Sequence, residues 1–316
     1  MLHTLTAERP NLHGHFSRDL APVLTIDAGD SVHFQCLDSR WGLEPYSGID
    51  RNRREVEGRD PVLDQGHAMT GPVAVRGANP GMTLEVKINK ICVGDWGFTF
   101  AGGWSTEWND RLDVGTKGVC HVWTFDTERQ TGRDQHGYGV RLRPFMGIYG
   151  LAPAEPGIHS TIPPRRVGGN IDCKELIAGS TLYLPIEVEG ALFSVGDGHA
   201  VQGDGELSVT AIECPMDRVD LTFNLRNDFL LDAPIALTPA GWVTLGFNHD
   251  LDEAVVMALE SMLTLMKRLY GLERLEALAL ASLVVDMRVT QMVNQVRGAH
   301  AVLRPDAIVM ASEPRP

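Results

Sequence analysis

The chain has 316 residues, 43% of them hydrophobic, and a formal net charge of −13. This length and apolar content suffice to bury a large core and exclude a fibrous or disordered protein. The negative charge disfavours nucleic acid and anionic membrane surfaces as partners, because the one short basic cluster, residues 51–54, does not offset it and is expected to be a solvated loop. No apolar window is long enough to predict a membrane span.

The cysteines are scattered along the chain without a Cys-x-x-Cys pair, at Cys36, Cys92, Cys120, Cys173 and Cys214. This spacing predicts neither a zinc knuckle nor a disulfide framework, and a reducing compartment is the simpler inference. The first residues show no charged start followed by an apolar run, so no signal peptide is predicted. We therefore expect a cytoplasmic protein.

The first two thirds of the chain predict strands. Residues 22–37 and 72–93 alternate apolar and polar side chains, which is typical of strands and hairpins. Residues 40–66 between them are charged and predict a long excursion that could cover a site. Residues 95–139 are rich in glycine and tryptophan, which either wall a pocket or fill a sandwich core. Strands are expected again at 180–188 and 206–214, with a loop before the second.

Apolar residues at helical spacing predict two helices near the C-terminus, at 251–270 and 272–283, separated by Gly271. The fold class is therefore mainly β or α+β, with β-sandwich-like layers and C-terminal helices. We expect a β-rich core over residues 1–250 and a helical region over 251–316 packed on it, together forming one domain. A homo-oligomer is expected for a large β-rich scaffold of this kind.

The segment 192–207 combines glycines with acidic residues, a histidine and a glutamine, which predicts a metal or catalytic loop. Asp197 and His199 lie two residues apart, as do Asp204 and Glu206, so in extended backbone each pair projects from one face. Carboxylates with one imidazole suit Zn²⁺, Mn²⁺ or Ca²⁺. The alternative is that Gly-Asp-Gly is ordinary turn chemistry and the acids face solvent.

A second loop, residues 165–172, follows the rigid Pro163-Pro164 pair. Its glycines allow a close backbone approach before Asn170 and Asp172 are presented, again two residues apart. Gly-Gly-Asn is also ordinary turn material, so this loop alone is a weak signal.

The run GGNIDCKELIAGSTLYLPIEVEGALFSVGDGHAVQGDGE and the upstream RPFMGIYGLAPAEPG resemble the acetamidase/formamidase family. Further matches in order, PVLTIDAGDSVHFQCLDS, GHAMTGPVAVRGANPGMTLEVKI and SLVVDMRVTQMVN, extend the resemblance over nearly the whole chain. The resemblance implies hydrolysis of a short aliphatic amide, of the formamide or acetamide type, to a carboxylate and ammonia. It also makes His67 a candidate site histidine.

Amide hydrolysis needs a nucleophile, a stabiliser of the oxyanion and a proton for the leaving nitrogen. A metal ion, zinc first and calcium or manganese as alternatives, would activate water and polarise the carbonyl. The expected metal ligands are Asp172, Asp197 and His199, with Asp38 as a fourth because it follows a predicted strand. Glu206 or Asp204 would carry the proton, and Asn170 and Gln202 would orient the amide.

Two other hypotheses on the function stay open. Cys173, next to Asp172, could be the nucleophile of a thiol amidase, although a free cysteine is more often a small buried hydrophobic residue. The chain could also be a non-enzymatic β-sandwich binding protein in which the acidic segment holds a metal for structure only.

Overall fold

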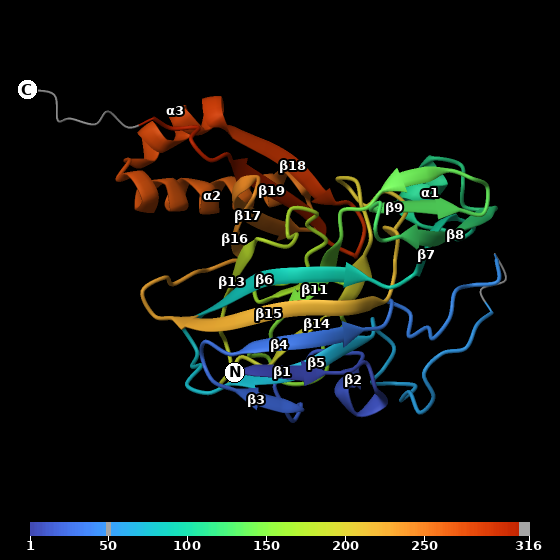
Figure 1. Ribbon diagram of the computed structural model, residues 1–316. Helices are drawn as coiled ribbons and strands as arrows, with labels where there is room; N and C mark the ends of the chain where they lie inside the picture. Colours follow the sequence, from blue (N-terminus) through green and yellow to red (C-terminus); the bar gives the residue numbers. More distant parts are fainter. Residues whose placement is uncertain (49–51, 310–316) are drawn as a thin grey trace, which may run out of the picture.

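The computed structural model describes residues 1–48 and 52–309. Over these residues the strands form three sheets, and two long helices follow near the C-terminus (Figure 1). The expectation of a mainly β fold with sandwich-like layers and C-terminal helices is confirmed. Among the described residues, no helix combines the length and the apolar character needed to cross a membrane.

The largest sheet has nine strands and is antiparallel apart from the pair at its N-terminal edge. Two 11-residue strands, 83–93 and 216–226, lie side by side in it, and burial alternates along the second, as expected for a sheet with one face on the core. In spatial order the strands are β1 (Leu2–Leu5), β4 (Ser31–Cys36), β15 (Met216–Arg226), β6 (Thr83–Val93), β13 (Thr181–Pro185), β16 (Ile235–Thr238), β17 (Gly241–Asn248), β19 (Arg297–Leu303) and β18 (Val285–Gln291).

A six-stranded sheet packs face to face with the large one, where β4 and β15 lie near its N-terminal edge. Phe193 of the smaller sheet contacts the rings of Phe34 and Phe223 in the larger, at centroid distances of 6.2 and 5.0 Å. All three rings are buried in the main hydrophobic core. The smaller sheet contains β12 (Gly168–Asn170), β11 (Phe145–Gly150), β14 (Phe193–His199), β5 (Met69–Val75) and β2 (Leu12–His13), and β3 (Leu24–Ile26) pairs with β5. The short 3-10 turn η1 (Arg9–Asn11) precedes β2.

The glycine- and tryptophan-rich region forms a separate four-stranded sheet that projects to one side of the molecule (Figure 1). Its strands are β10 (Gly139–Arg141), β9 (Thr131–Asp134), β8 (Gly118–Asp126) and β7 (Trp96–Gly102), and the short helix α1 (Glu107–Arg111) follows β7. Trp123 is buried in the main core, whereas Trp96 and Trp104 pack against a smaller cluster around Phe98 and Phe100. Trp108 instead lines a cavity. Both expected roles of the tryptophans therefore occur.

The two predicted C-terminal helices are present as α2 (Leu251–Tyr270) and α3 (Arg274–Val284). The Asp250 side chain caps the first turn of α2, and Gly271 ends the helix in left-handed backbone. Helix α2 packs on β17 and β19 through buried residues at helical spacing. The region 251–316 is not helical throughout, because β18 and β19 follow the helices and form the edge of the large sheet.

Two local predictions are wrong, and glycine explains the first. Residues 193–199 form the fully buried strand β14 between β11 and β5, whereas their sequence predicts a loop. A Cβ atom on Gly196 would lie 2.4 Å from the Ala68 carbonyl oxygen, and one on Gly198 would lie 2.6 Å from Met216 Cγ. These glycines therefore serve close packing instead of a turn.

The second error is the strand expected at residues 206–214, which instead form turns and isolated bridges. Glu206 and Val209 have φ angles of 45° and 72°, which are incompatible with a strand, and Leu207 is 70% exposed. The apolar alternation in this segment therefore does not reflect a strand with one buried face.

Candidate metal centre

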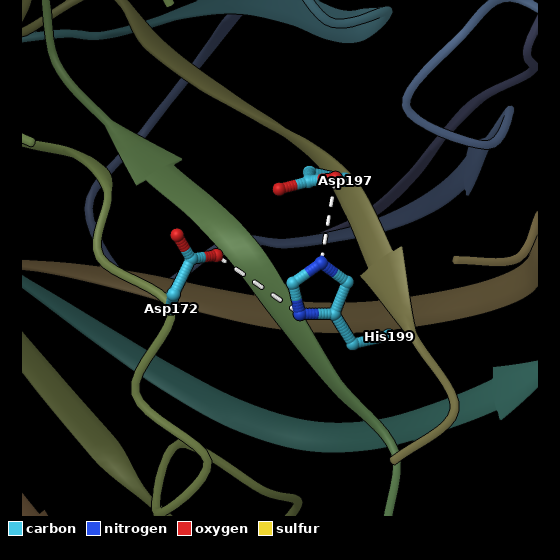
Figure 2. A group of neighbouring side chains, drawn as sticks. All are labelled: Asp172, Asp197 and His199. Carbon is cyan, nitrogen blue, oxygen red and sulfur yellow. Dashed lines mark ion pairs between the residues drawn. The ribbon is translucent and has the colours of Figure 1, made fainter. Parts of the chain in front are cut away.

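Asp172, Asp197 and His199 meet in the interior, and their side chains point toward one another (Figure 2). His199 Nε2 lies 3.4 Å from Asp197 Oδ1 and 3.3 Å from Glu213 Oε1, and its Nδ1 lies 4.0 Å from Asp172 Oδ1. His199, Glu206 and Glu213 form a second, overlapping group of potential ligands. We call these five buried residues the acidic cluster.

Three chain segments supply the acidic cluster. The end of β14 carries Asp197 and His199, and Asp172 follows β12 across the intervening strand β11. The turns after β14 supply Glu206 and Glu213. Bridges from Glu213 to His199 and to Phe98 of β7 fix the position of these turns.

Three of the carboxylate residues adopt left-handed backbone: φ is 51° at Asp172, 58° at Asp197 and 45° at Glu206. This conformation costs an L-residue roughly 1 kcal/mol relative to the usual regions. Such strained residues gather at functional sites, where the surrounding structure holds them in place.

Gly147 of β11 leaves the space into which the acidic cluster projects. A Cβ atom on Gly147 would lie 2.5 Å from Asp197 Oδ2, 2.6 Å from Asp172 Oδ1 and 2.9 Å from His199 Cε1. The Gly147 carbonyl oxygen also accepts hydrogen bonds from the backbone N–H groups of Ile171 and Asp172, at 2.9 and 3.2 Å. This glycine therefore both positions Asp172 and keeps the centre of the cluster open.

Burial and mutual repulsion disfavour the charged forms of most of the carboxylates. Burial raises the pKa of Asp172 well above its usual range, and the neighbouring Glu206 and Asp197 raise it further. Burial likewise raises the pKa of Glu206 to about 8 and that of Glu213 to about 7, in both cases against the opposing effect of His199.

His199 and Asp197 behave as an oppositely charged pair. Burial lowers the pKa of His199, but Glu213 and Asp197 outweigh this effect and hold it well above its usual value. Burial raises the pKa of Asp197, but the neighbouring His199 and, to a smaller extent, His67 overcome this effect and leave the pKa below its usual range.

Several potential ligand atoms are buried without a hydrogen-bond partner: both ring nitrogens of His199, Asp172 Oδ1 and Glu213 Oε2. Buried polar atoms normally have partners, so this group of atoms needs an explanation. Four carboxylates surround one imidazole, and Gly147 keeps their centre open. They supply the oxygen and nitrogen ligands that a divalent cation prefers. The residues present therefore fit a metal ion.

Some of the other predicted site residues lie beside the acidic cluster, and the rest lie outside it. Gln202 Nε2 donates to the Asp172 carbonyl oxygen at 2.9 Å, so Gln202 supports the cluster. Asn170 is buried, donates through Nδ2 to the Ile162 carbonyl oxygen, and keeps Oδ1 unpartnered. Asp204 is a third exposed and pairs with Lys174 at 3.0 Å, outside both ligand groups.

Asp38 is also outside both ligand groups. Its two oxygens accept hydrogen bonds from Arg53 at 2.7 and 2.8 Å, and both side chains are fully buried. Burial raises the pKa of Asp38, and the Arg53 guanidinium opposes this shift. Within the basic cluster predicted to be solvated, Arg53 is thus a buried partner, Arg54 is exposed, and Arg51 lies outside the described residues.

Sequence reasoning missed Glu213 and Asn294. Asn294 Nδ2 donates to Asp172 Oδ2 at 2.7 Å and to Glu206 Oε2 at 3.2 Å. It lies between β18 and β19, in a C-terminal segment that carried the family resemblance but was given no role. The available signal for Glu213 was an acid in an apolar context, between Ile212 and Cys214.

Two further candidates lie next to the cluster. His67 bonds Thr161 Oγ1 through Nδ1 at 2.8 Å, and burial lowers its pKa while Asp197 raises it. Cys173 is buried, and burial raises the pKa of its thiol to about 12. A thiol with so high a pKa is a weak candidate for the nucleophile, because the thiolate is the reactive form.

The comparisons with known proteins agree with this fold and site. The sequence model described as "Acetamidase/Formamidase family" matches residues 2–159 and 157–240, well over half of the chain. The chain belongs to this family. The crystal structure of an acetamidase from Bacillus halodurans has a TM-score of 0.82 and 27% identity, covering 95% of this chain and 97% of that one.

Two curated sequences are related over a smaller part of their length. The formamidase of Methylophilus methylotrophus is 28% identical and the acetamidase of Mycolicibacterium smegmatis 27% identical, each over 62% of this chain. The matches cover 60% and 61% of these relatives, so the chain spans less than two thirds of their length.

Proposed function

We propose that this member of the acetamidase/formamidase family hydrolyses the carbon–nitrogen bond of a short aliphatic amide to a carboxylate and ammonia. The observation that carries the proposal is the buried acidic cluster. In it, His199, Asp172 and Glu213 have potential metal-ligand atoms without hydrogen-bond partners. The names of the related formamidase and acetamidase support the substrate class.

Asp172, Asp197 and His199 would hold a divalent metal ion, zinc by preference, with manganese or calcium as alternatives. Bound there, the ion would supply a Lewis acid that polarises the amide carbonyl and activates water. The burial of the cluster supports this assignment, because electrostatic stabilisation is strongest where bulk water is excluded.

Glu206 is the residue we assign to proton transfer. Its carboxylate would accept the proton that the attacking water loses and deliver it to the leaving nitrogen, so that ammonia departs. Its position beside Asp172, where both accept from Asn294, supports this role over the more exposed Asp204. Asn170 and Gln202 keep unpartnered side-chain oxygens, which are acceptors for a substrate N–H group.

Two further properties belong to the same proposal. Four free cysteines, at positions 36, 92, 173 and 214, support the cytoplasm as the compartment. Helix α3 exposes Leu275 and Leu283, at 82% and 77%, and such apolar surface supports a homo-oligomer. Light scattering of the purified protein measures the oligomeric state directly.

The decisive experiment measures ammonia release from formamide, acetamide and propionamide before and after chelation, with Zn²⁺, Mn²⁺ or Ca²⁺ added back. We expect chelation to abolish turnover and one ion to restore it. Asp197→Asn should also abolish turnover, whereas Asp217→Asn, an exposed acid at the start of β15, should leave it unchanged.

Three results would contradict the proposal in different ways. Turnover that ignores chelators and is lost on thiol alkylation would support Cys173 as the nucleophile. Metal-dependent thermal stability without any amide turnover would support the non-enzymatic binding protein. Turnover of ureas or carbamates, without turnover of amides, would show that the enzyme hydrolyses another kind of carbon–nitrogen bond.

A further inference from the structure

A cavity of about 460 Å³ lies between the start of helix α1 and the tip of the hairpin formed by β18 and β19. Part of its wall is apolar, and Asn294 also faces it. The residues that matter for the argument are Trp108, Val209, Met292, Val293, Asn294 and Val296. We call this space the hairpin cavity.

Asn294 connects the hairpin cavity to the acidic cluster. The same side chain that lines the cavity donates through Nδ2 to Asp172 and to Glu206. Asn294 and Gln295 both adopt left-handed backbone, with φ of 63° and 68°, at the tip of the hairpin. This tight tip directs the Asn294 amide toward the cluster, so the inner end of the cavity lies one side chain away from the two carboxylates.

The walls of the hairpin cavity are joined by specific contacts between distant parts of the chain. Trp108 Nε1 donates to the Met292 carbonyl oxygen at 3.0 Å. Arg297 donates to Glu107 and to the His249 carbonyl oxygen, both at 3.0 Å. The cavity is therefore formed by the fold itself, as ligand sites usually are.

The hairpin cavity is larger than the smallest amides need, and part of its wall is apolar. Formamide and acetamide carry only a hydrogen or a methyl group on the carbonyl carbon, whereas cavities of about 300–1,000 Å³ hold molecules several times larger. An indole ring, a methionine and three valines offer apolar contact, and Thr106, His249 and Gln295 add polar groups to the wall. The two charged side chains in the wall, Glu107 and Arg297, pair with each other.

We propose that the hairpin cavity binds the acyl portion of the substrate, and that the enzyme accepts amides with a bulky apolar acyl group, branched or aryl. This inference rests on the proposed function, because it places the carbonyl at the acidic cluster. Asn294, at the junction of cavity and cluster, holds Asp172 and Glu206 in position at that carbonyl.

The test compares kcat/KM for formamide, acetamide, isobutyramide and phenylacetamide in the metal-loaded wild-type protein and in Val296→Trp. The half-buried Val296 lines the cavity, so a tryptophan there would fill part of it. We expect wild-type kcat/KM to be highest for the larger amides. Val296→Trp should lower it about tenfold or more for phenylacetamide and less than about threefold for formamide.

Val256→Trp is the matched control, because Val256 is 55% exposed on α2 and does not line the cavity. It should leave the whole substrate profile unchanged. Calorimetric binding of phenylacetamide to chelated protein adds a measurement independent of turnover. We expect binding to the wild type and to Val256→Trp, and weak or no binding to Val296→Trp.

The outcomes separate this inference from the proposed function. If small amides are hydrolysed but phenylacetamide is neither hydrolysed nor bound, the cavity assignment is overturned and the amidase proposal stands. If no amide is hydrolysed but phenylacetamide binds and Val296→Trp removes the binding, the cavity is a ligand site and the amidase proposal fails. An equal effect of Val296→Trp on all four amides overturns the acyl assignment.

Discussion

A side chain at position 147 would project into the centre of the acidic cluster. We predict that Gly147→Ala leaves the fold intact, since the nearest atoms include flexible side-chain ends, but displaces Asp172, Asp197 and His199. Metal affinity, measured by calorimetry on chelated protein, should fall at least tenfold, because small displacements of ligands or their supports weaken metal sites strongly.

Gly203→Ala is the control for this substitution. A Cβ atom on Gly203 would meet nothing within 4 Å, and this residue lies in the same glycine-rich segment as Glu206. The interpretation of Gly147 fails if both variants bind metal as tightly as the wild type.

Asn294 acts on the acidic cluster through its two carboxylate bonds. We predict that Asn294→Ala lowers kcat about 10- to 100-fold with little change in KM for formamide, because supporting hydrogen bonds orient the ligands of a metal. Metal affinity should fall in parallel. Gln295→Ala changes the exposed neighbour in the same turn and should have neither effect. An equal loss of thermal stability and activity in both variants would indicate a merely structural turn.

Part of the site could be predicted from residues alone. Two-residue spacing indicated Asp197 with His199, and the structure places both with Asp172 in one cluster. Spacing could not identify Asn294, which reaches the cluster from a hairpin 122 residues beyond Asp172. Nor could it show that Asp38 is held by Arg53, because both positions lie in a connection without periodicity.

At the scale of elements, the long connection between β4 and β5 depends on one buried ion pair. The side chains of Asp38 and Arg53 are fully buried, and Arg53 lies over the ring of Tyr46 at 4.0 Å. We predict that Arg53→Met lowers the free energy of unfolding by about 3–5 kcal/mol, because it leaves a buried carboxylate without its partner. Urea denaturation measures this loss.

Arg54→Met provides the comparison one residue away. Arg54 is 74% exposed in its pair with Glu44, and such surface pairs contribute about 1 kcal/mol or less. Similar losses from the two substitutions would show that the buried pair does not stabilise the connection.

Helices were easier to predict than the central strand. The apolar spacing of α2, its Asp250 cap and its Gly271 stop are all local signals. In β14, glycine normally signals a turn, but here Gly196 and Gly198 allow neighbouring chains to approach closely. That reason lies in tertiary packing, which no local window contains.

At the scale of the whole molecule, a buried histidine that links two strands of the six-stranded sheet makes stability depend on pH. His13 bonds the His15 carbonyl oxygen and Ser194 Oγ of β14, and burial lowers its pKa to about 4 from an ordinary 6.5. Between these values the unfolded chain binds a proton that the folded chain does not. Stability is therefore fully present above pH 6.5, falls as pH drops toward 4, and loses up to about 3 kcal/mol from this group.

The variant His13→Gln should lose this part of the pH dependence. Urea unfolding of chelated protein at pH 7 and pH 4.5 measures the difference between the two pH values, which should be smaller in the variant than in the wild type. His136→Gln, at an exposed histidine, should retain the wild-type difference. An unchanged difference in His13→Gln would remove His13 as its source.

Because Asp172, Asp197 and Glu206 have left-handed backbone, substitutions that raise heat resistance at these positions are expected to remove activity. Glycine adopts such φ angles without the steric cost that an L-residue bears, and it would also remove a buried carboxylate. Selection for heat resistance alone would therefore favour glycine at the very positions that form the acidic cluster. A library screened for thermal tolerance should be screened for turnover in the same round, or the most robust variants will be inactive scaffolds.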